Sequence, residues 1–310
     1  MRVLVALDGS EPGDLARELV ANLTWPPDTT LRLVSVAPDL FAMPAGPFPE
    51  AAPPITSEIE ARVVDGQRQM LEAAGAKLTG QGQRVETFVR RGRPATAIVA
   101  EASAFGADLV VLGARGHSTL SAVVLGSVSE EVVSHAPCPV LVARTPRVER
   151  ILLADDGSEG ASRARRFLVQ WRPFGRVPIR IVSVASAPAP WQSGVSPMLM
   201  GAALDAYDDS LRESRDRLEA AAKGSVEELA DVAAEATVDV RAGDPSREVV
   251  AAAAEWQADL IVTGSRGLSG IRSVLLGSVA RNVLHHAPCS VLVVRAVQPE
   301  GMEDGSTSAE

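Results

Sequence analysis

The residues of this chain that could bind a ligand form one glycine pattern, and the pattern occurs twice. The first copy runs from Gly113 to Ser127 as Gly-x2-Gly-x9-Gly-Ser, and the second runs from Gly264 to Ser278 with the same spacing. Glycines at the end of a strand allow a backbone to approach a bulky ligand without a clashing Cβ. A Gly-Ser pair that opens a helix presents free N–H groups and a hydroxyl to phosphate oxygens. The pattern therefore predicts a nucleotide phosphate site in each half.

Two carboxylates and two arginines accompany the pattern. Asp8 and Asp156 each follow the first apolar run of their half, and Arg115 and Arg266 lie inside the glycine turns. The aspartates could simply hold a turn or start a helix, and the arginines could be solvated loop residues. At the mouth of a sheet, however, the aspartates would accept hydrogen bonds from a base or ribose, and the arginines would clamp phosphate. We favour binding, because strand ends converge at the switch point of a doubly wound sheet.

The two copies differ at the start of the helix that follows. Ser127 and Ser278 are good helix caps, and Ser127 with Glu130 has the spacing of a capping box, so a plain helix start is an alternative to phosphate binding. The counterpart of Glu130 is Arg281. Charge alone then predicts that the second site holds polyphosphate better than the first.

Catalytic and metal-binding signatures are weak or missing. His117 follows the first glycine turn and Leu268 replaces it in the second copy, so it is weak support for catalysis. His135, His285 and His286 precede Ala-Pro-Cys at a predicted helix end and are interpreted as structural. The sequence contains no P-loop, no Rossmann fingerprint, no Cys/His cluster and no nucleophile elbow. These absences argue against the corresponding classes of enzyme.

Composition limits the partners. The chain has 310 residues and a net charge of −9, which argues against nucleic acid and requires local positive potential at any phosphate site. No apolar run is long enough for a membrane span, and no signal peptide is visible at the start. Cys138 and Cys289 occupy equivalent places in the repeat and are interpreted as packing positions. We therefore expect a cytoplasmic protein without disulfides.

The elements that must position these residues repeat along the chain. We expect one domain over residues 1–146, a second over 147–296, and a disordered acidic tail over 297–310. Short apolar runs alternate with helical segments such as 94–105 and 245–256, which predicts an α/β fold with two doubly wound domains. The predicted strands are 2–7, 31–36, 84–90, 107–112, 138–144, 150–155, 179–184, 235–241, 258–263 and 289–295. Proline-rich segments at 37–54 and 185–201 interrupt the pattern and fit lids or surface insertions equally well.

The whole constellation resembles the universal stress protein family. The resemblance rests on the two glycine patterns, on Asp-Gly-Ser after the first strand, and on Ala-Pro-Cys before the last strand, in both halves. It implies a five-stranded parallel sheet of order 3-2-1-4-5 in each domain, with ATP held at the carboxyl ends of strands 1 and 4. It implies two ATP per chain, with Mg²⁺ bound through the phosphates. Some family members bind cyclic AMP instead, which the glycine pattern does not exclude.

The resemblance also assigns roles to residues. Asp8 and the backbone of Val36 would hold adenine and ribose, and the phosphates would lie on Gly113, Gly116, Gly126, Ser127 and Val128, with Arg115 and His117 nearby. The same roles in the second half fall to Asp156, Val184, Gly264, Arg266, Gly267, Gly277, Ser278 and Val279. Leu268, which stands opposite His117, departs from the pattern of the first copy.

Three functions follow, of which we favour the first. They are a regulatory ATP-binding module of the stress response, a slow ATPase or nucleotide phosphotransferase, and an interaction protein with vestigial sites. No residue is an obvious general base for a γ-phosphate, so we do not expect an enzyme. The last strands, 138–144 and 289–295, should lie at sheet edges and pair with each other, making the chain a covalent pseudo-dimer. The sequence does not decide whether two copies of the tandem chain form a homodimer.

Overall fold

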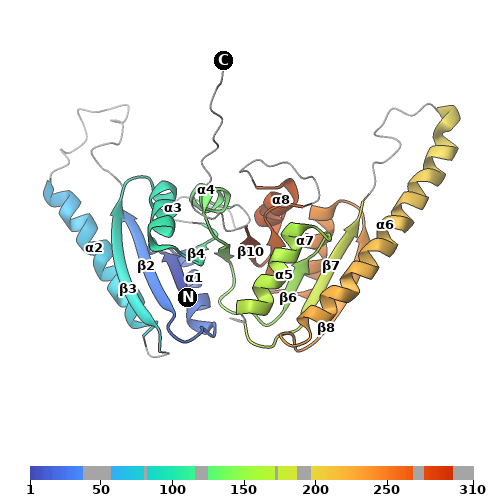
Figure 1. Ribbon diagram of the computed structural model, residues 1–310. Helices are drawn as coiled ribbons and strands as arrows, with labels where there is room; N and C mark the ends of the chain where they lie inside the picture. The colour runs from blue at the N-terminus through green and yellow to red at the C-terminus, as the bar shows by residue number, and fades with distance from the viewer. Residues whose placement is uncertain are drawn as a thin grey trace, which may run out of the picture.

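The computed structural model describes residues 1–37, 57–79, 82–115, 125–171, 174–186, 197–267 and 276–295. In these ranges strands and helices alternate along both halves (Figure 1). The strands are β1 Arg2–Ala6, β2 Thr30–Ala37, β3 Arg84–Arg91, β4 Leu109–Gly113, β5 Val140–Ala143, β6 Ile151–Ala154, β7 Ile179–Ala185, β8 Ala236–Ala242, β9 Leu260–Gly264 and β10 Ser290–Val294. The helices are α1 Glu11–Asn22, α2 Ser57–Ala76, α3 Pro94–Phe105, α4 Ser127–His135, α5 Glu159–Trp171, α6 Met200–Leu229, α7 Pro245–Trp256 and α8 Ser278–His286.

All ten predicted strands are present, and they form one continuous sheet. Its order is β3-β2-β1-β4-β5-β10-β9-β6-β7-β8, so each half has the expected order 3-2-1-4-5. Every pairing within a half is parallel. β4 and β9 are buried along their whole length, as expected for strands covered on both faces.

Helices cover both faces of the sheet. Apolar residues of α1, α2, α5 and α6 pack on one face. Residues of α3, α4, α7 and α8 pack on the other, in a cluster that continues from one half to the other. Doubly wound sheets bind ligands at the carboxyl ends of their strands, beside the point where the strand order reverses. In each half that point lies between the first and fourth strands, β1 and β4 or β6 and β9.

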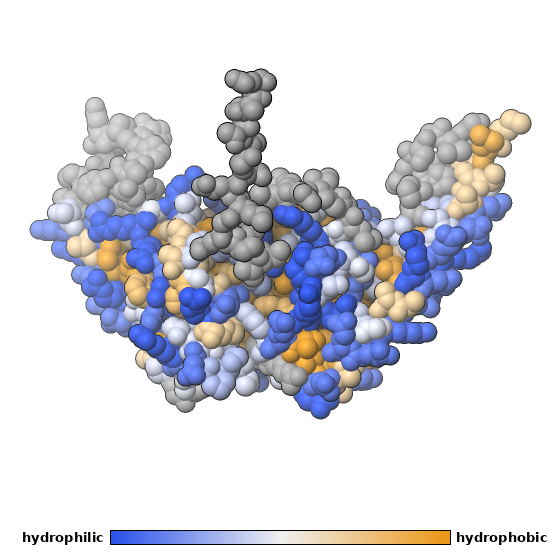
Figure 2. Space-filling model, in the orientation of Figure 1, coloured by the Kyte–Doolittle hydropathy of each residue, from blue (hydrophilic) through white to orange (hydrophobic). Residues whose placement is uncertain are grey.

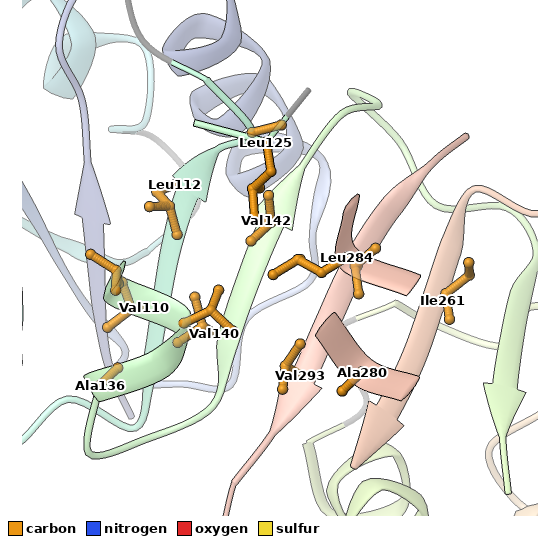
Figure 3. Packing of buried hydrophobic residues seen from close by; sticks show 14 of the residues in the cluster. Val110, Leu112, Leu125, Ala136, Val140, Val142, Ile261, Ala280, Leu284 and Val293 are labelled. Atoms are coloured by element: carbon orange, nitrogen blue, oxygen red, sulfur yellow. The ribbon is translucent and has the colours of Figure 1, made fainter. Parts of the chain in front are cut away.

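The two halves meet where β5 and β10 pair antiparallel, with Leu141 opposite Leu292. Val140 and Val142 lie on one side of this seam, and Val293 with Leu284 of α8 lies on the other (Figure 3). The last strand of each half would otherwise leave an unpaired edge, and the seam removes both edges at once. The edge strands therefore pair with each other as the sequence predicted.

Two partly buried arginines connect the halves at the seam. Arg144 follows β5 and donates to the carbonyl of Leu284, at 2.6 Å, in the last turn of α8. Arg295 follows β10 and donates to the carbonyls of Val133, at 2.8 Å, and Ser134 in α4. Each half thus satisfies terminal carbonyl groups of a helix in the other half.

The second proline-rich segment is shorter than predicted. β7 continues to Ala185, a single 3₁₀ turn covers Pro197–Leu199, and α6 begins at Met200. The first segment beyond Ala37 and the predicted tail lie outside the described residues. At 30 residues, α6 is longer than the 20-residue α2. Met198 and Leu199 in the 3₁₀ turn and Leu204 in α6 are exposed. Hydrophobic atoms gather at this projecting end of the molecule (Figure 2).

The cysteines occupy packing positions, as predicted. Cys138 and Cys289 are free and buried, and burial raises the pKa of each thiol to about 12. In the described ranges, no helix combines the length and the apolar character needed to cross a membrane.

Candidate functional site

Each half has a cavity at the carboxyl ends of its central strands. The first has a volume of about 270 Å³ and the second about 420 Å³. The predicted residues that line the first are Asp8, Val36, Gly113, Arg115, Gly126, Ser127 and Val128. Those that line the second are Asp156, Val184, Gly264, Arg266, Gly267, Gly277, Ser278 and Val279. Gly116 and His117 lie outside the described residues. The fold thus gathers every described residue of the prediction around two cavities.

The turn after the first strand fixes the carboxylate. Asp8 accepts hydrogen bonds from the Ser10 amide, at 3.0 Å, and from the Ser10 hydroxyl, at 2.5 Å. In the second half, Asp156 Oδ1 accepts from the Ser158 amide at 3.0 Å. Gly9, at φ +78°, turns the chain between Asp8 and Ser10 through a conformation that favours glycine. Asp8 and Asp156 therefore each hold the turn and line a cavity with the same side chain.

The glycines serve packing as well as the cavity. A Cβ on Gly113 would collide with the backbone carbonyl of Pro12 at the start of α1. A Cβ on Gly264 would lie 2.5 Å from the carbonyl carbon of Gly160 at the start of α5. These two glycines let the first helix approach the fourth strand, which sequence reasoning had attributed to the ligand alone.

Gly267 has a different neighbour. A Cβ built there would lie 2.5 Å from Asp156 Oδ2. The backbone at Gly267 does not adopt a positive φ. The missing side chain leaves room for the carboxylate of Asp156.

The helix that follows the glycine pattern opens toward the cavity. Gly126 and Gly277 occupy the cap positions, and no side chain caps either helix there. The interpretation of Ser127 as a cap is wrong, since it is the first helical residue. The amides of the first turn have no partner within a helix, because an intrahelical bond needs a carbonyl four residues earlier. Together with the positive end of the helix dipole, they make a site for an anion.

A backbone carbonyl faces each cavity from the second strand. Leu7 donates its amide to the Val34 carbonyl at 2.9 Å, so that carbonyl points toward β1. Carbonyl directions alternate along a strand, so the Val36 carbonyl points the same way, beyond the end of β1. Asp155 and Val182 repeat the arrangement at 3.0 Å, which directs the Val184 carbonyl into the second cavity. Gln67 Nε2 already donates to the Val36 carbonyl at 3.3 Å in the first half. A carbonyl oxygen has two lone pairs, so each of these carbonyls can still accept a hydrogen bond from a base amino group.

Arginines give each cavity positive potential in an acidic chain. Burial lowers the pKa of the Arg144 guanidinium, and the positive charge of nearby Arg115 lowers it further. Burial and then Arg266 lower the pKa of Arg295 in the same way. Arginine stays protonated in proteins despite such shifts. The first cavity is therefore lined by Arg115 with Arg144 nearby, and the second is lined by Arg266 and Arg217 with Arg295 near Arg266.

Glu130 and Arg281, whose opposite charges distinguish the two halves, line neither of the two cavities described above. Glu130 Oε1 instead lies 3.4 Å from His285 Nε2 across the seam. The capping box was a wrong prediction, because the cap is Gly126, whereas the effect of the Glu130 charge on phosphate binding stays a prediction.

Sequence reasoning missed the outer wall of the second cavity. It is lined by Ser186, which follows β7, and by three residues of α6, Ser214, Arg217 and Leu218. In the first cavity, apolar residues such as Ile98 form a wall that was also missed. An alignment of the two halves could have found the wall from α6, because it matches Arg217 in the second half with Gly66 in the first.

Both halves of the chain are similar to proteins of one known family. The universal stress protein family model matches residues 1–144 and again 147–295. A universal stress protein of Mycobacterium tuberculosis (strain H37Rv) is 30% identical over 305 residues, covering 94% of this chain and 96% of that protein. One of Bacillus subtilis is 31% identical over 145 residues, which is 46% of this chain and 98% of that protein. The crystal structure of a universal stress protein from Archaeoglobus fulgidus aligns with a TM-score of 0.62 at 20% identity, covering 95% of this chain and 98% of that one.

Proposed function

Because this chain belongs to the universal stress protein family, we propose that it is a regulatory module of the stress response that binds ATP in both halves. One observation carries the proposal. An anion-binding helix start, a carboxylate and an outward-facing strand carbonyl line the same cavity in each half. These groups match the phosphates, the ribose hydroxyls and the amino group of an adenine nucleotide in turn.

Mg²⁺ would arrive with the phosphates. Within the described ranges, no three His, Cys, Asp or Glu side chains are grouped as a metal would require. Mg²⁺ commonly keeps several waters and is bound through nucleotide phosphates, which suits such a site. Two free, buried cysteines fit the reducing environment of the cytoplasm, where we place the protein.

Thermal unfolding with and without Mg-ATP tests the proposal. At a hundredfold excess over Kd, each site should stabilise the folded chain by about 2.7 kcal/mol. For 310 residues that unfold together, this corresponds to a rise of about 4 °C per site. A melting temperature unmoved by millimolar Mg-ATP would contradict the proposal.

The same sample separates the alternatives. Stabilisation by cyclic AMP in place of ATP would indicate a cyclic-nucleotide-binding protein. Steady phosphate release over hours, absent without protein, would indicate a slow ATPase. No stabilisation by either nucleotide would indicate an interaction protein with vestigial sites.

A further inference from the structure

Among the described residues, the second cavity has a wall from α6 that has no counterpart from α2 in the first. Ser214, Arg217 and Leu218 of α6 line the second cavity, whereas no described residue of α2 lines the first. The second cavity is accordingly larger, at about 420 Å³ against about 270 Å³. α6 packs against β7 and β8, so this wall lies on the side of the cavity away from the glycine turn.

The register of the two helices shows what has changed. Leu71 and Leu78 of the first half are buried, and so are Ala222 and Leu229, which lie 151 positions later. On the same offset, Arg217 stands where the first half has Gly66. Ser214 stands in place of Val63, and Leu218 in place of Gln67. Within this wall the second half thus gains a cation and a hydroxyl.

The replacement of Gln67 also opens the base end of the second cavity. Gln67 Nε2 donates to the Val36 carbonyl at 3.3 Å in the first half. Leu218 has no donor, so it leaves the equivalent Val184 carbonyl to a ligand. At the base end of the second cavity, the Val184 carbonyl receives no hydrogen bond from the residue in the position of Gln67, whereas the Val36 carbonyl of the first cavity does.

Arg217 is set apart from its neighbours on α6 by its charge environment. Arg212 pairs with Asp209 and Arg215 with Glu219, each at 2.9 Å. Arg217 Nε donates to the backbone carbonyl of Glu213 at 3.3 Å. In the part of the chain that the structure describes, no carboxylate forms an ion pair with Arg217. Its guanidinium keeps donors for a ligand in the cavity that it lines.

The two cations of the second cavity lie on opposite walls. Arg266 follows β9, while α6 packs beside β7 and β8, and β6 separates β9 from β7. Neighbouring strands are about 4.8 Å apart, so strands on the two sides are separated by about 10 Å. A ligand with a single phosphate chain at the start of α8 would leave one of the two arginines without an anionic partner. A ligand with two separated anionic groups would pair with both arginines.

We propose that the second site takes an adenine nucleotide that carries a further phosphate on its ribose, bound by Arg217 and Ser214. The inference rests on the proposed function, since the 5′-phosphate chain and the base occupy the positions described above. An arginine with a neighbouring hydroxyl is suited to a phosphate group. The first site, with Gly66 and Val63 at these positions, makes no such distinction.

Titration calorimetry with three probes tests this inference. Adenosine 3′,5′-bisphosphate carries two separated phosphates, ADP carries two adjacent ones, and AMP carries one. At one site per chain, the bisphosphate should bind at least about tenfold more tightly than AMP, the equivalent of one charge-assisted hydrogen bond. Arg217→Gln should abolish this preference, because it weakens binding of the bisphosphate more than binding of AMP. The matched variant Arg215→Gln, on the same helix, should retain the preference.

The outcomes separate this inference from the proposed function. Binding of AMP and ADP without a preference for the bisphosphate overturns the inference alone. Equal losses of AMP and bisphosphate affinity in Arg217→Gln also overturn it, because Arg217 would then contact the part that both ligands share. Absence of binding by all three probes overturns the inference together with the proposed function.

Discussion

Replacing Gly267 with alanine should damage the second site without damaging the fold. The added Cβ would lie 2.5 Å from Asp156 Oδ2, closer than real Cβ contacts allow, so the carboxylate must move. Gly267 does not adopt a positive φ, so the left-handed conformation that favours glycine is not required there. If Asp156 loses one charge-assisted hydrogen bond to the nucleotide, binding weakens by about 1.5–3 kcal/mol. That is a loss of about 10- to 150-fold in affinity at one site.

Calorimetry of wild type and Gly267→Ala with Mg-ATP measures this loss, and urea unfolding of the same samples measures stability. Gly224→Ala is the matched control, because a Cβ there meets no atom within 4 Å. This control should stabilise the chain by about 0.4–1 kcal/mol and leave both sites intact. Two sites of undiminished affinity in Gly267→Ala would refute the role given to Asp156. A large loss of stability would instead show that the glycine is required for folding.

Three further predictions concern the body of the protein. Arg295→Gln should lower the free energy of unfolding by about 1.5–3 kcal/mol, because terminal carbonyls of α4 lose a charged donor; an unchanged urea midpoint would contradict the fastening role. Burial acts to raise the pKa of Glu101, but hydrogen bonds and charge from Arg90 and Arg32 outweigh it and hold that pKa below its usual 4.5. The ionised form therefore stabilises the fold above pH 4.5 and the benefit is lost as pH falls through the lowered value, so the stability gap between wild type and Glu101→Gln should shrink in acid; a gap independent of pH would count against it. Cutting the chain near Thr145 should expose β5 and β10 and give dimers or aggregates of each half, and two monomeric halves without mutual affinity would exclude the seam as a strong contact.

The strands and the cavities could be predicted from the sequence because they depend on local signals. Continuous apolar runs such as 109–112 specify buried strands, and the repeat places equivalent residues at equivalent strand ends. The edge pairing of β5 with β10 followed from the cost of exposing two apolar edges in one chain.

What escaped prediction depends on contacts distant in sequence. The packing of α1 against Gly113 and the contact of Glu130 with His285 arise only after the sheet is assembled. Arg217 resembles its arginine neighbours in sequence, and only the register of α6 against β7 and β8 directs it to the cavity. The cap position moved by one residue, to Gly126, which local preferences for serine did not anticipate.

The number of ATP molecules bound per chain tests the central claim most directly. Calorimetric titration of the intact chain with ATP and Mg²⁺ should give two sites, and Gly267→Val should reduce the count to one while its far-ultraviolet circular dichroism stays unchanged. Gly116→Val should remove the other site. No binding at millimolar ATP, or two full sites in both variants, would contradict the account.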